Sequence, residues 1–190
     1  MTDTPPLADL PDEDLMLLVA RGIVREPAAE LFNRHNRALF NYLAWLARGQ
    51  LGEAEDIAQS TWIRVLSRCG DYRPTAAFRT FLFQIARHLW LDSKGSAWQR
   101  TTVSDEAVPE ASDEGELSPE TELALRQNSH RVRTALLSLP AAQREAVALR
   151  FFADMSVDDI AATAGVGLET IKSRLRYAFR HLRTELERAP

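Results

Sequence analysis

The chain has few of the features that redox, metal-dependent and nucleotide-binding enzymes require. It contains one cysteine, Cys69, which excludes an intramolecular disulfide and a cysteine-rich zinc site. Its four histidines stand far apart in the sequence without metal-ligand spacing, and no glycine-rich phosphate-binding loop occurs. We therefore expect no metal, no cofactor and no catalytic activity in this chain.

A secretion signal and long apolar runs are also missing. The first segment, MTDTPPLADLPDEDL, is acidic and contains prolines, unlike the basic start and apolar centre of a signal peptide. No apolar stretch approaches the roughly 20 residues of a membrane-spanning helix. The composition is nevertheless 45% hydrophobic, which is enough for globular cores. We expect a folded protein of a reducing compartment, with the cytoplasm as the default location.

The sequence also lacks strand-like patterns. No segment alternates apolar and polar residues convincingly, whereas helical periodicity recurs in nearly every segment outside one acidic stretch. We therefore predict an all-α fold. Helices are expected at residues 12–25, 28–48, 53–66 and 78–93, with a loop at 68–77. Asp12 is expected to cap the first helix, and Pro27 to open the second.

The net charge of −4 conceals a division within the chain. Residues 104–122, SDEAVPEASDEGELSPETE, carry eight carboxylates and no basic residue, and without them the chain would stand at +4. Such a stretch buries too little apolar surface to fold alone, which predicts a flexible acidic linker. We place the linker at residues 101–122, between domains at 1–100 and 123–190. The alternative is a long exposed loop inside a single domain, which is uncommon in compact folds.

Residues 156–182, SVDDIAATAGVGLETIKSRLRYAFRHL, have the layout of a helix-turn-helix. Ser156 is positioned to cap the first helix, and two aspartates follow where the helix dipole favours negative charge. Gly165 ends that helix and permits the tight turn. The second helix is basic, with five Lys or Arg residues and no carboxylate between Lys172 and Arg183. This layout is typical of proteins that place a helix in the major groove of DNA.

Helical periodicity assigns two faces to the second helix. At about 100° per residue, an apolar packing stripe is formed by Ile171, Leu175, Ala178 and Leu182. The opposite side, here called the recognition face, would be presented to the major groove. The recognition face consists of Lys172, Ser173, Arg176, Tyr177 and Arg180. The alternative is an ordinary helical hairpin whose basic face is only solvated.

The segment FRTFLFQIARHLWLDS, residues 78–93, interleaves aromatic and cationic side chains. Rings that stack on unpaired bases and cations that hold phosphates make a surface for single-stranded nucleic acid. The polar candidates for such contacts are Arg79, Arg87 and His88. A core helix would show the same composition, and helical aromatic residues are usually buried, so we expect most of these rings in the core.

Residues 53–66 also divide into two faces. The continuous apolar stripe is formed by Ile57, Ala58, Thr61, Trp62, Val65 and Leu66. The side chains that point the other way are Asp56, Gln59, Ser60 and Ile63. That second face is available for solvent or for a partner.

Taken together, these segments resemble bacterial sigma factors of the extracytoplasmic-function group, group 4 of the sigma-70 family. AEDIAQSTWIRVL is similar to sigma region 2.2, and FRTFLFQIARHLWLD is similar to regions 2.3 and 2.4. LLSLPAAQREAVALRFF is similar to region 4.1, and IAATAGVGLETIKSRL to the helix-turn-helix of region 4.2. The resemblance covers nearly the whole chain in the family's order and spacing. It implies a region 2 helical bundle and a region 4 helix-turn-helix domain, joined by a flexible linker.

The resemblance implies that the protein binds core RNA polymerase and directs promoter-specific transcription initiation. Region 4 of the family reads the −35 element of promoter DNA as duplex, and its contacting positions fall on the recognition face. Regions 2.3 and 2.4 pull a base of the −10 element out of the stack. The implied −10 contacts are Cys69, Asp71, Tyr72, Arg79, Arg87 and His88. Region 2.2 docks on the β′ clamp helices of the polymerase, and the implied core contacts are Asp56, Gln59, Ser60 and Ile63.

The resemblance also implies two further partners. Region 4 of the family contacts the β flap of the polymerase, and an anti-sigma factor, often membrane-bound, hides the polymerase-binding faces of both domains. Three positions depart from the usual pattern. His88 stands where Asn is common, Ser60 replaces a common acidic residue, and Gly167 occupies the N-cap of the recognition helix.

Two other classes of protein fit less of the sequence. A conventional helix-turn-helix regulator that acts without polymerase would explain residues 156–183 equally well. It would need a sensory or phosphoacceptor domain, however, and no alternating strand and helix pattern precedes the helix-turn-helix. Such a regulator would bind duplex operator tightly by itself, whereas a sigma factor needs core enzyme. An enzyme is disfavoured by the absences described above.

Overall fold

The computed structural model describes residues 6–95 and 131–188. Every regular element within these ranges is a helix, which confirms the all-α prediction. The elements are η1 (Leu7–Asp9), α1 (Asp12–Ala20), α2 (Arg25–Leu46), α3 (Leu51–Ser67), η2 (Cys69–Asp71), α4 (Phe78–Lys94), a helical segment at 131–137, α6 (Ala141–Phe152), α7 (Val157–Ala164) and α8 (Leu168–Arg188). The expected linker at 101–122 lies outside the described residues, so its boundaries stay a prediction.

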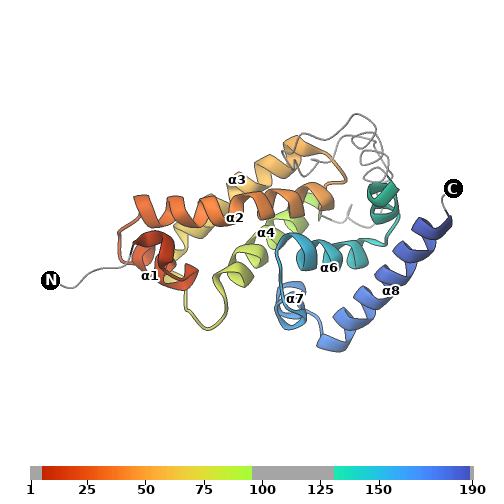
Figure 1. Cartoon of the computed structure of the whole chain (residues 1–190). Coiled ribbons are helices and arrows are strands. Elements are labelled where there is room, and N and C mark those ends of the chain that lie inside the picture. Colours follow the sequence, from red (N-terminus) through yellow and green to blue (C-terminus); the bar gives the residue numbers. More distant parts are fainter. Residues whose placement is uncertain (1–5, 96–130, 189–190) are drawn as a thin grey trace, which may run out of the picture.

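The first half of the chain is built around α2, which packs against α1, α3 and α4 (Figure 1). Pro27 lies in the first turn of α2, where its fixed φ angle suits a helix start and its missing N–H costs nothing. Leu31, Leu39 and Leu43 follow at helical spacing and are buried. These residues form the centre of the bundle because they place one apolar stripe against three neighbouring helices.

The start of the first helix differs from the prediction. Pro11, not Asp12, is the N-cap of α1, and the helix ends at Ala20, earlier than expected. The Asp12 carboxylate binds α2 instead, because Arg34 Nη1 donates to it at 2.9 Å and His35 Nε2 lies 2.6 Å from it. Burial raises the pKa of Asp12, but the hydrogen bonds and charges of His35 and Arg34 outweigh burial and hold that pKa below its usual value.

The helix-turn-helix is formed by α7 and α8, as predicted. Ser156 caps α7 in a reciprocal capping box, with its Oγ accepting from the Asp159 N–H at 3.1 Å. Gly165 follows α7 at φ 67°, a left-handed conformation that glycine adopts without strain. Ile171 and Ala178 of α8 are fully buried, so the packing stripe of the second helix lies where periodicity put it.

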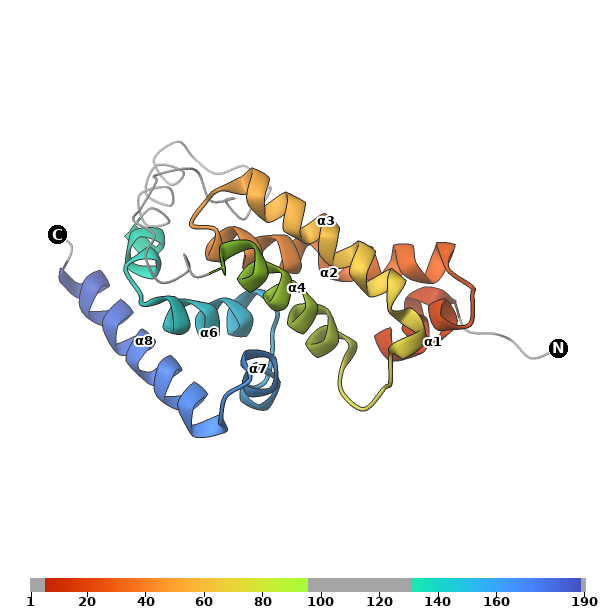
Figure 2. The same cartoon turned by 180° about the vertical axis from the view of Figure 1, so that it is seen from behind.

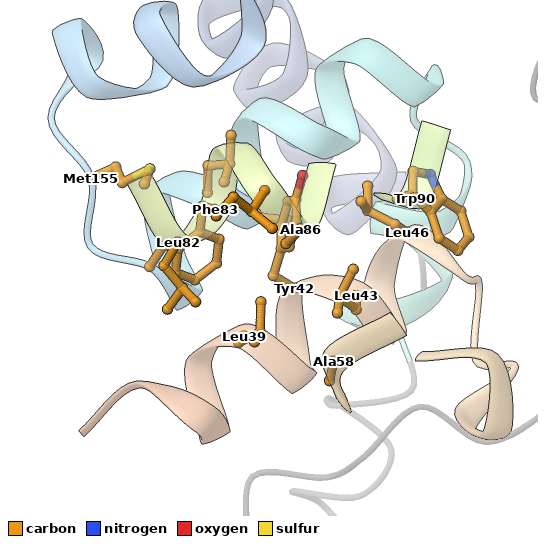
Figure 3. Close-up of a cluster of buried hydrophobic side chains, with 14 of the residues drawn as sticks. Leu39, Tyr42, Leu43, Leu46, Ala58, Leu82, Phe83, Ala86, Trp90 and Met155 are labelled. Carbon is orange, nitrogen blue, oxygen red and sulfur yellow. The ribbon is translucent and has the colours of Figure 1, made fainter. Parts of the chain in front are cut away.

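The two halves of the chain share one continuous apolar core. α6 packs along α2, and α7 packs along α4, as Figure 2 shows from behind. Trp45 of α2 stacks on Phe152 of α6 with ring centroids 5.9 Å apart. Met155, between α6 and α7, is buried beside Leu82 of α4 (Figure 3). The helices before and after the undescribed segment are therefore packed together rather than held apart.

Candidate nucleic-acid interface

The recognition face of α8 is open to solvent. Its members are exposed except for Ser173, which is half-buried. Tyr177 is 44% exposed, and the guanidinium groups of Arg176 and Arg180 lie 5.4 and 4.8 Å from its ring centroid. These cation–π contacts hold both positive charges at the surface, close to one aromatic ring. The arrangement presents hydrogen-bond donors and an aromatic edge on a single helix face.

The polar contacts of the recognition face within the protein are weak. Lys172 Nζ lies 2.7 Å from a carboxylate oxygen of Glu169, but both side chains are more than half exposed. Arg176 reaches Ser173 Oγ only at 3.5 Å. Exposed ion pairs and long hydrogen bonds contribute little to stability, so these side chains can exchange their partners for DNA at small cost.

The aromatic residues of α4 are mostly core residues, which confirms the expectation from periodicity. Phe78, Phe83 and Trp90 are almost completely buried. The Phe83 ring meets Tyr42 of α2 edge-on, with centroids 5.3 Å apart. Phe81 is only partly buried and contacts Tyr72. The rings of α4 therefore hold the bundle together, and they leave its polar side chains as the candidates for nucleic-acid contacts.

Those polar side chains differ in accessibility. His88 is exposed, whereas Arg79 and Arg87 already have partners from the second half of the chain. Arg87 Nε donates to the buried Glu145 carboxylate at 2.7 Å, and Arg79 donates to the Asp154 carbonyl at 3.1 Å. In this conformation, the two arginines expected to contact the −10 element are therefore bound to other residues of the protein.

The loop at 68–77 contains the short helix η2, and its candidate residues for the −10 element differ in their exposure to solvent. Asp71 is exposed and Cys69 is half-buried, but Tyr72 is only 3% exposed. The Tyr72 ring packs edge-on against Phe81, and its hydroxyl has no hydrogen-bond partner within the described ranges. Burial, followed by the charges of Glu13 and Asp12, raises the pKa of Tyr72 to about 12. Tyr72 is therefore a core residue here, unlike the others of its loop.

The exposed face of α3 carries the residues expected on it. Asp56, Gln59, Ser60 and Ile63 are exposed, and Ile63 is 69% exposed. Phe32 of α2 was not among the expected residues; its ring centroid lies 5.3 Å from that of Trp62, and the residue is 43% exposed. In the sequence, Phe32 is marked only by its position next to Leu31 of the buried stripe of α2. Its exposure beside Trp62 depends on the packing of α2 against α3, which the sequence does not show. Two helices that pack together thus each expose an apolar side chain, Phe32 on α2 and Ile63 on α3.

Residues 6–95 and 131–188 contain no cluster of three or more His, Cys, Asp or Glu side chains arranged to hold a metal ion. None of the helices in those ranges is sufficiently long and apolar to span a bilayer.

Comparison with known proteins identifies the family. Residues 31–100 match the family described as Sigma-70 region 2, and residues 135–184 match Sigma-70, region 4. The ECF RNA polymerase sigma factor SigL of Mycobacterium tuberculosis is 31% identical over 163 residues, which cover 83% of this chain and 87% of SigL.

Solved structures show the same fold. CnrH, in complex with the cytosolic domain of CnrY, superposes with a TM-score of 0.70 at 21% identity over 94% of this chain and 99% of CnrH. RpoE of Bartonella quintana, in complex with the anti-sigma factor NepR, gives a TM-score of 0.61 at 22% identity, over 94% of this chain and 98% of RpoE. The chain therefore belongs to the ECF sigma factors of the sigma-70 family, which are transcription initiation factors and not enzymes.

Proposed function

We propose that α8 carries promoter specificity by inserting its recognition face into the major groove of the −35 element. The observation that carries this proposal is the exposed group of Arg176, Tyr177 and Arg180 on a helix whose opposite stripe is buried. A helix held in this way presents a rigid set of donors to base edges, and an arginine can bind the O6 and N7 atoms of guanine with two hydrogen bonds.

The −10 element is proposed to bind region 2 along α4 and the loop before it. Cys69, Asp71 and His88 are accessible for this role, and Arg79 and Arg87 supply the positive charge. We assign Tyr72 a supporting role, because its buried ring packs under the loop. A captured base must be unstacked at a cost of a few kcal/mol, which contacts from this loop would offset.

Core RNA polymerase is proposed to dock on the exposed face of α3. Asp56 and Gln59 offer polar contacts to the β′ clamp helices, and Ile63 and Phe32 add exposed apolar area. Exposed apolar residues with a polar surround are typical of protein interfaces. Region 4 is proposed to contact the β flap in the same holoenzyme.

An anti-sigma factor, membrane-bound in our proposal, is the expected regulatory partner of this chain. RpoE of Bartonella quintana, which shares the fold, is seen in complex with the anti-sigma factor NepR. The cytoplasm is the proposed location, because core polymerase and promoter DNA are found there.

Reconstituted transcription tests the proposed function directly. The purified chain is mixed with bacterial core RNA polymerase and a genomic promoter library, and transcript start sites are mapped. We expect discrete start sites that are absent with core alone, preceded by shared −35 and −10 sequences. Absence of core binding, together with tight binding of duplex operator by the chain alone, would identify a conventional regulator instead.

A further inference from the structure

The start of α4, directly after the loop at 68–77, has no capping side chain of its own. Its N-cap residue is Ala77, whose methyl group cannot accept a hydrogen bond, and its first turn carries no acidic residue. The first turn carries Arg79 instead, although a cation is unfavourable beside the positive end of a helix dipole. The first four N–H groups of a helix have no partner within it, so this start depends on an acceptor from elsewhere.

Glu13 of α1 supplies that acceptor from within the first half of the chain. The N–H of Phe78, the first residue of α4, donates to Glu13 Oε1 at 2.8 Å, across 65 residues of sequence. Glu13 is half-buried, so water competes less for this bond than at an exposed cap. The carboxylate also places negative charge beside the positive end of the α4 dipole. Glu13 therefore caps α4 from a different helix.

α1 is a firmly held base for this cap. Arg34 of α2 donates to the Asp12 carboxylate at 2.9 Å and to the carbonyls of Leu10 and Ala8 at 2.8 and 2.7 Å. The apolar side of α1 lies in the hydrophobic core. Because both the start and the apolar side of α1 are fixed to the bundle, Glu13 fixes the start of α4 to the bundle as well.

The other end of the exposed part of the loop is held by Tyr72. Its ring is 3% exposed and packs edge-on against Phe78 and Phe81, with centroids 6.3 and 5.3 Å away. The short helix η2, which precedes Tyr72, packs on α1. After burial, the charge of Glu13 is the next cause of the raised pKa of Tyr72, so one carboxylate acts on both ends of the loop.

Residues 73–77 form an exposed tip between these two fixed points. All members of the tip are exposed, whereas Tyr72 before it and Phe78 after it are buried. Arg73 donates to the carbonyls of Gly70 and Tyr72 at 3.0 and 2.9 Å, which folds the first part of the loop on itself. A short tip with fixed ends has few conformations to lose on binding, so it can hold a ligand at a smaller entropic cost.

We propose that Glu13 is a positioning residue for −10 recognition, because it caps α4 and thereby fixes one end of the exposed tip at 73–77. This inference rests on the proposed −10 role of the loop. Glu13 acts through the loop and not on the DNA. Without the cap, the tip samples several arrangements, and the correct base then gains less over a wrong base because neither meets a single preformed site.

Three full-length variants separate this role from simple destabilisation. Glu13→Ala removes the acceptor of the Phe78 N–H. Glu13→Gln removes the charge but keeps an acceptor oxygen, so it is expected to restore the cap. Asp14→Ala is the matched control, because it removes the same charge from the neighbouring, exposed position in the first turn of α1.

The first measurement is the base selectivity of the holoenzyme. Each variant is assembled with core RNA polymerase, and binding is measured to a labelled single strand with the cognate −10 sequence and to one with a single −10 base changed. We expect the ratio of the two affinities to fall about fivefold for Glu13→Ala and to stay within about twofold of wild type for Glu13→Gln and Asp14→Ala. A merely unstable chain binds both strands less and keeps the ratio, so an unchanged ratio for Glu13→Ala would overturn the proposal.

The second measurement is amide hydrogen exchange of the free full-length chain, followed by NMR. The Phe78 amide is expected to exchange about fivefold faster in Glu13→Ala and at the wild-type rate in Asp14→Ala. Wild-type exchange at Phe78 in Glu13→Ala would show that the carboxylate does not cap α4, and this too would overturn the proposal.

The selectivity measurement also separates this inference from the proposed function. If the wild-type holoenzyme does not discriminate between the two strands, the proposed −10 role fails and the role of Glu13 fails with it. If wild type discriminates and Glu13→Ala discriminates equally, the −10 role stands and only the positioning role of Glu13 is overturned.

Discussion

Individual residues at the ends of helices show how far local chemistry specifies this protein. Ser156 and Asp159 were expected at the start of a helix, and they form a capping box there. Gly165 was expected to end that helix, and it does so in the left-handed conformation. Both outcomes depend on neighbours within a few residues, which is why the sequence was sufficient.

Removing the cap gives a prediction with a defined pH dependence. Ser156→Ala is expected to lower the free energy of unfolding by about 1 kcal/mol at neutral pH. The hydrogen bond from the Ser156 side chain is the largest cause of the lowered pKa of Asp159, whose ordinary value is 3.8. A lowered carboxyl pKa stabilises the folded chain above pH 3.8, and this stability is lost as pH falls through the folded-state value. In urea unfolding, the stability difference between wild type and variant should therefore be largest at pH 7. It should shrink as pH falls below the lowered pKa of Asp159, to the part that comes from the Asp159 N–H bond to Ser156 Oγ; a constant difference would contradict the role of the carboxylate.

A single arginine on the recognition face tests the DNA-binding assignment. Arg176→Ala is expected to cost about 1–3 kcal/mol of binding to the cognate −35 duplex when the holoenzyme is used. Arg174→Ala removes the same charge from a different side of α8 and should cost much less. Binding is measured on cognate and scrambled duplexes, and an equal loss on both would reassign Arg176 to a phosphate contact.

At the scale of whole helices, α3 and α4 have similar sequence patterns but differ in what covers their polar sides. Both carry an apolar stripe and a polar side. The polar side of α3 is exposed, as expected of a docking face, whereas that of α4 is covered by α7. Periodicity identifies which side of a helix is polar, but it does not say whether solvent, DNA or another helix covers that side.

The docking face of α3 yields a prediction about polymerase binding. Asp56→Ala with Gln59→Ala is expected to weaken binding to core RNA polymerase by about 1–2 kcal/mol, because interface truncations of this kind remove polar contacts without creating cavities. Helix content by circular dichroism should stay unchanged, since both side chains are exposed. Glu55→Ala, at a neighbouring exposed position, is the matched control. Loss of fold in the double variant would mean that these residues are structural.

At the scale of the whole molecule, the two halves are joined by a shared core. The Trp45 and Phe152 rings stack across it, and Met155 packs beside α4 (Figure 3). This junction was not expected, because the acidic stretch suggested two separate domains. The junction residues are apolar, like other core residues, and their sequence pattern does not indicate the helix against which they pack.

Thermodynamic coupling of the halves can be measured with the intrinsic tryptophans. All four tryptophans precede residue 100, and Trp45 also touches Phe152 of the second half, so the midpoint of the fluorescence transition, rather than the starting signal, reports the stability of the first half. Phe152→Ala, in the second half, is expected to destabilise the tryptophan-detected transition by about 2 kcal/mol, because it removes the stacked ring. Phe151→Ala is the matched control, because Phe151 is adjacent and 66% exposed. If Phe152→Ala left the tryptophan-detected unfolding transition unchanged, the two halves would unfold independently.

The sequence by itself determined the helices, the helix-turn-helix and the recognition face, because periodicity, caps and turns act over a few residues. Only the tertiary structure decided that Tyr72 is buried, that Asp12 binds α2 instead of capping α1, and that region 4 covers α4. Glu145 stands 58 residues from Arg87 and 103 residues from Tyr42. Contacts over such separations depend on how finished helices pack, which local patterns do not encode.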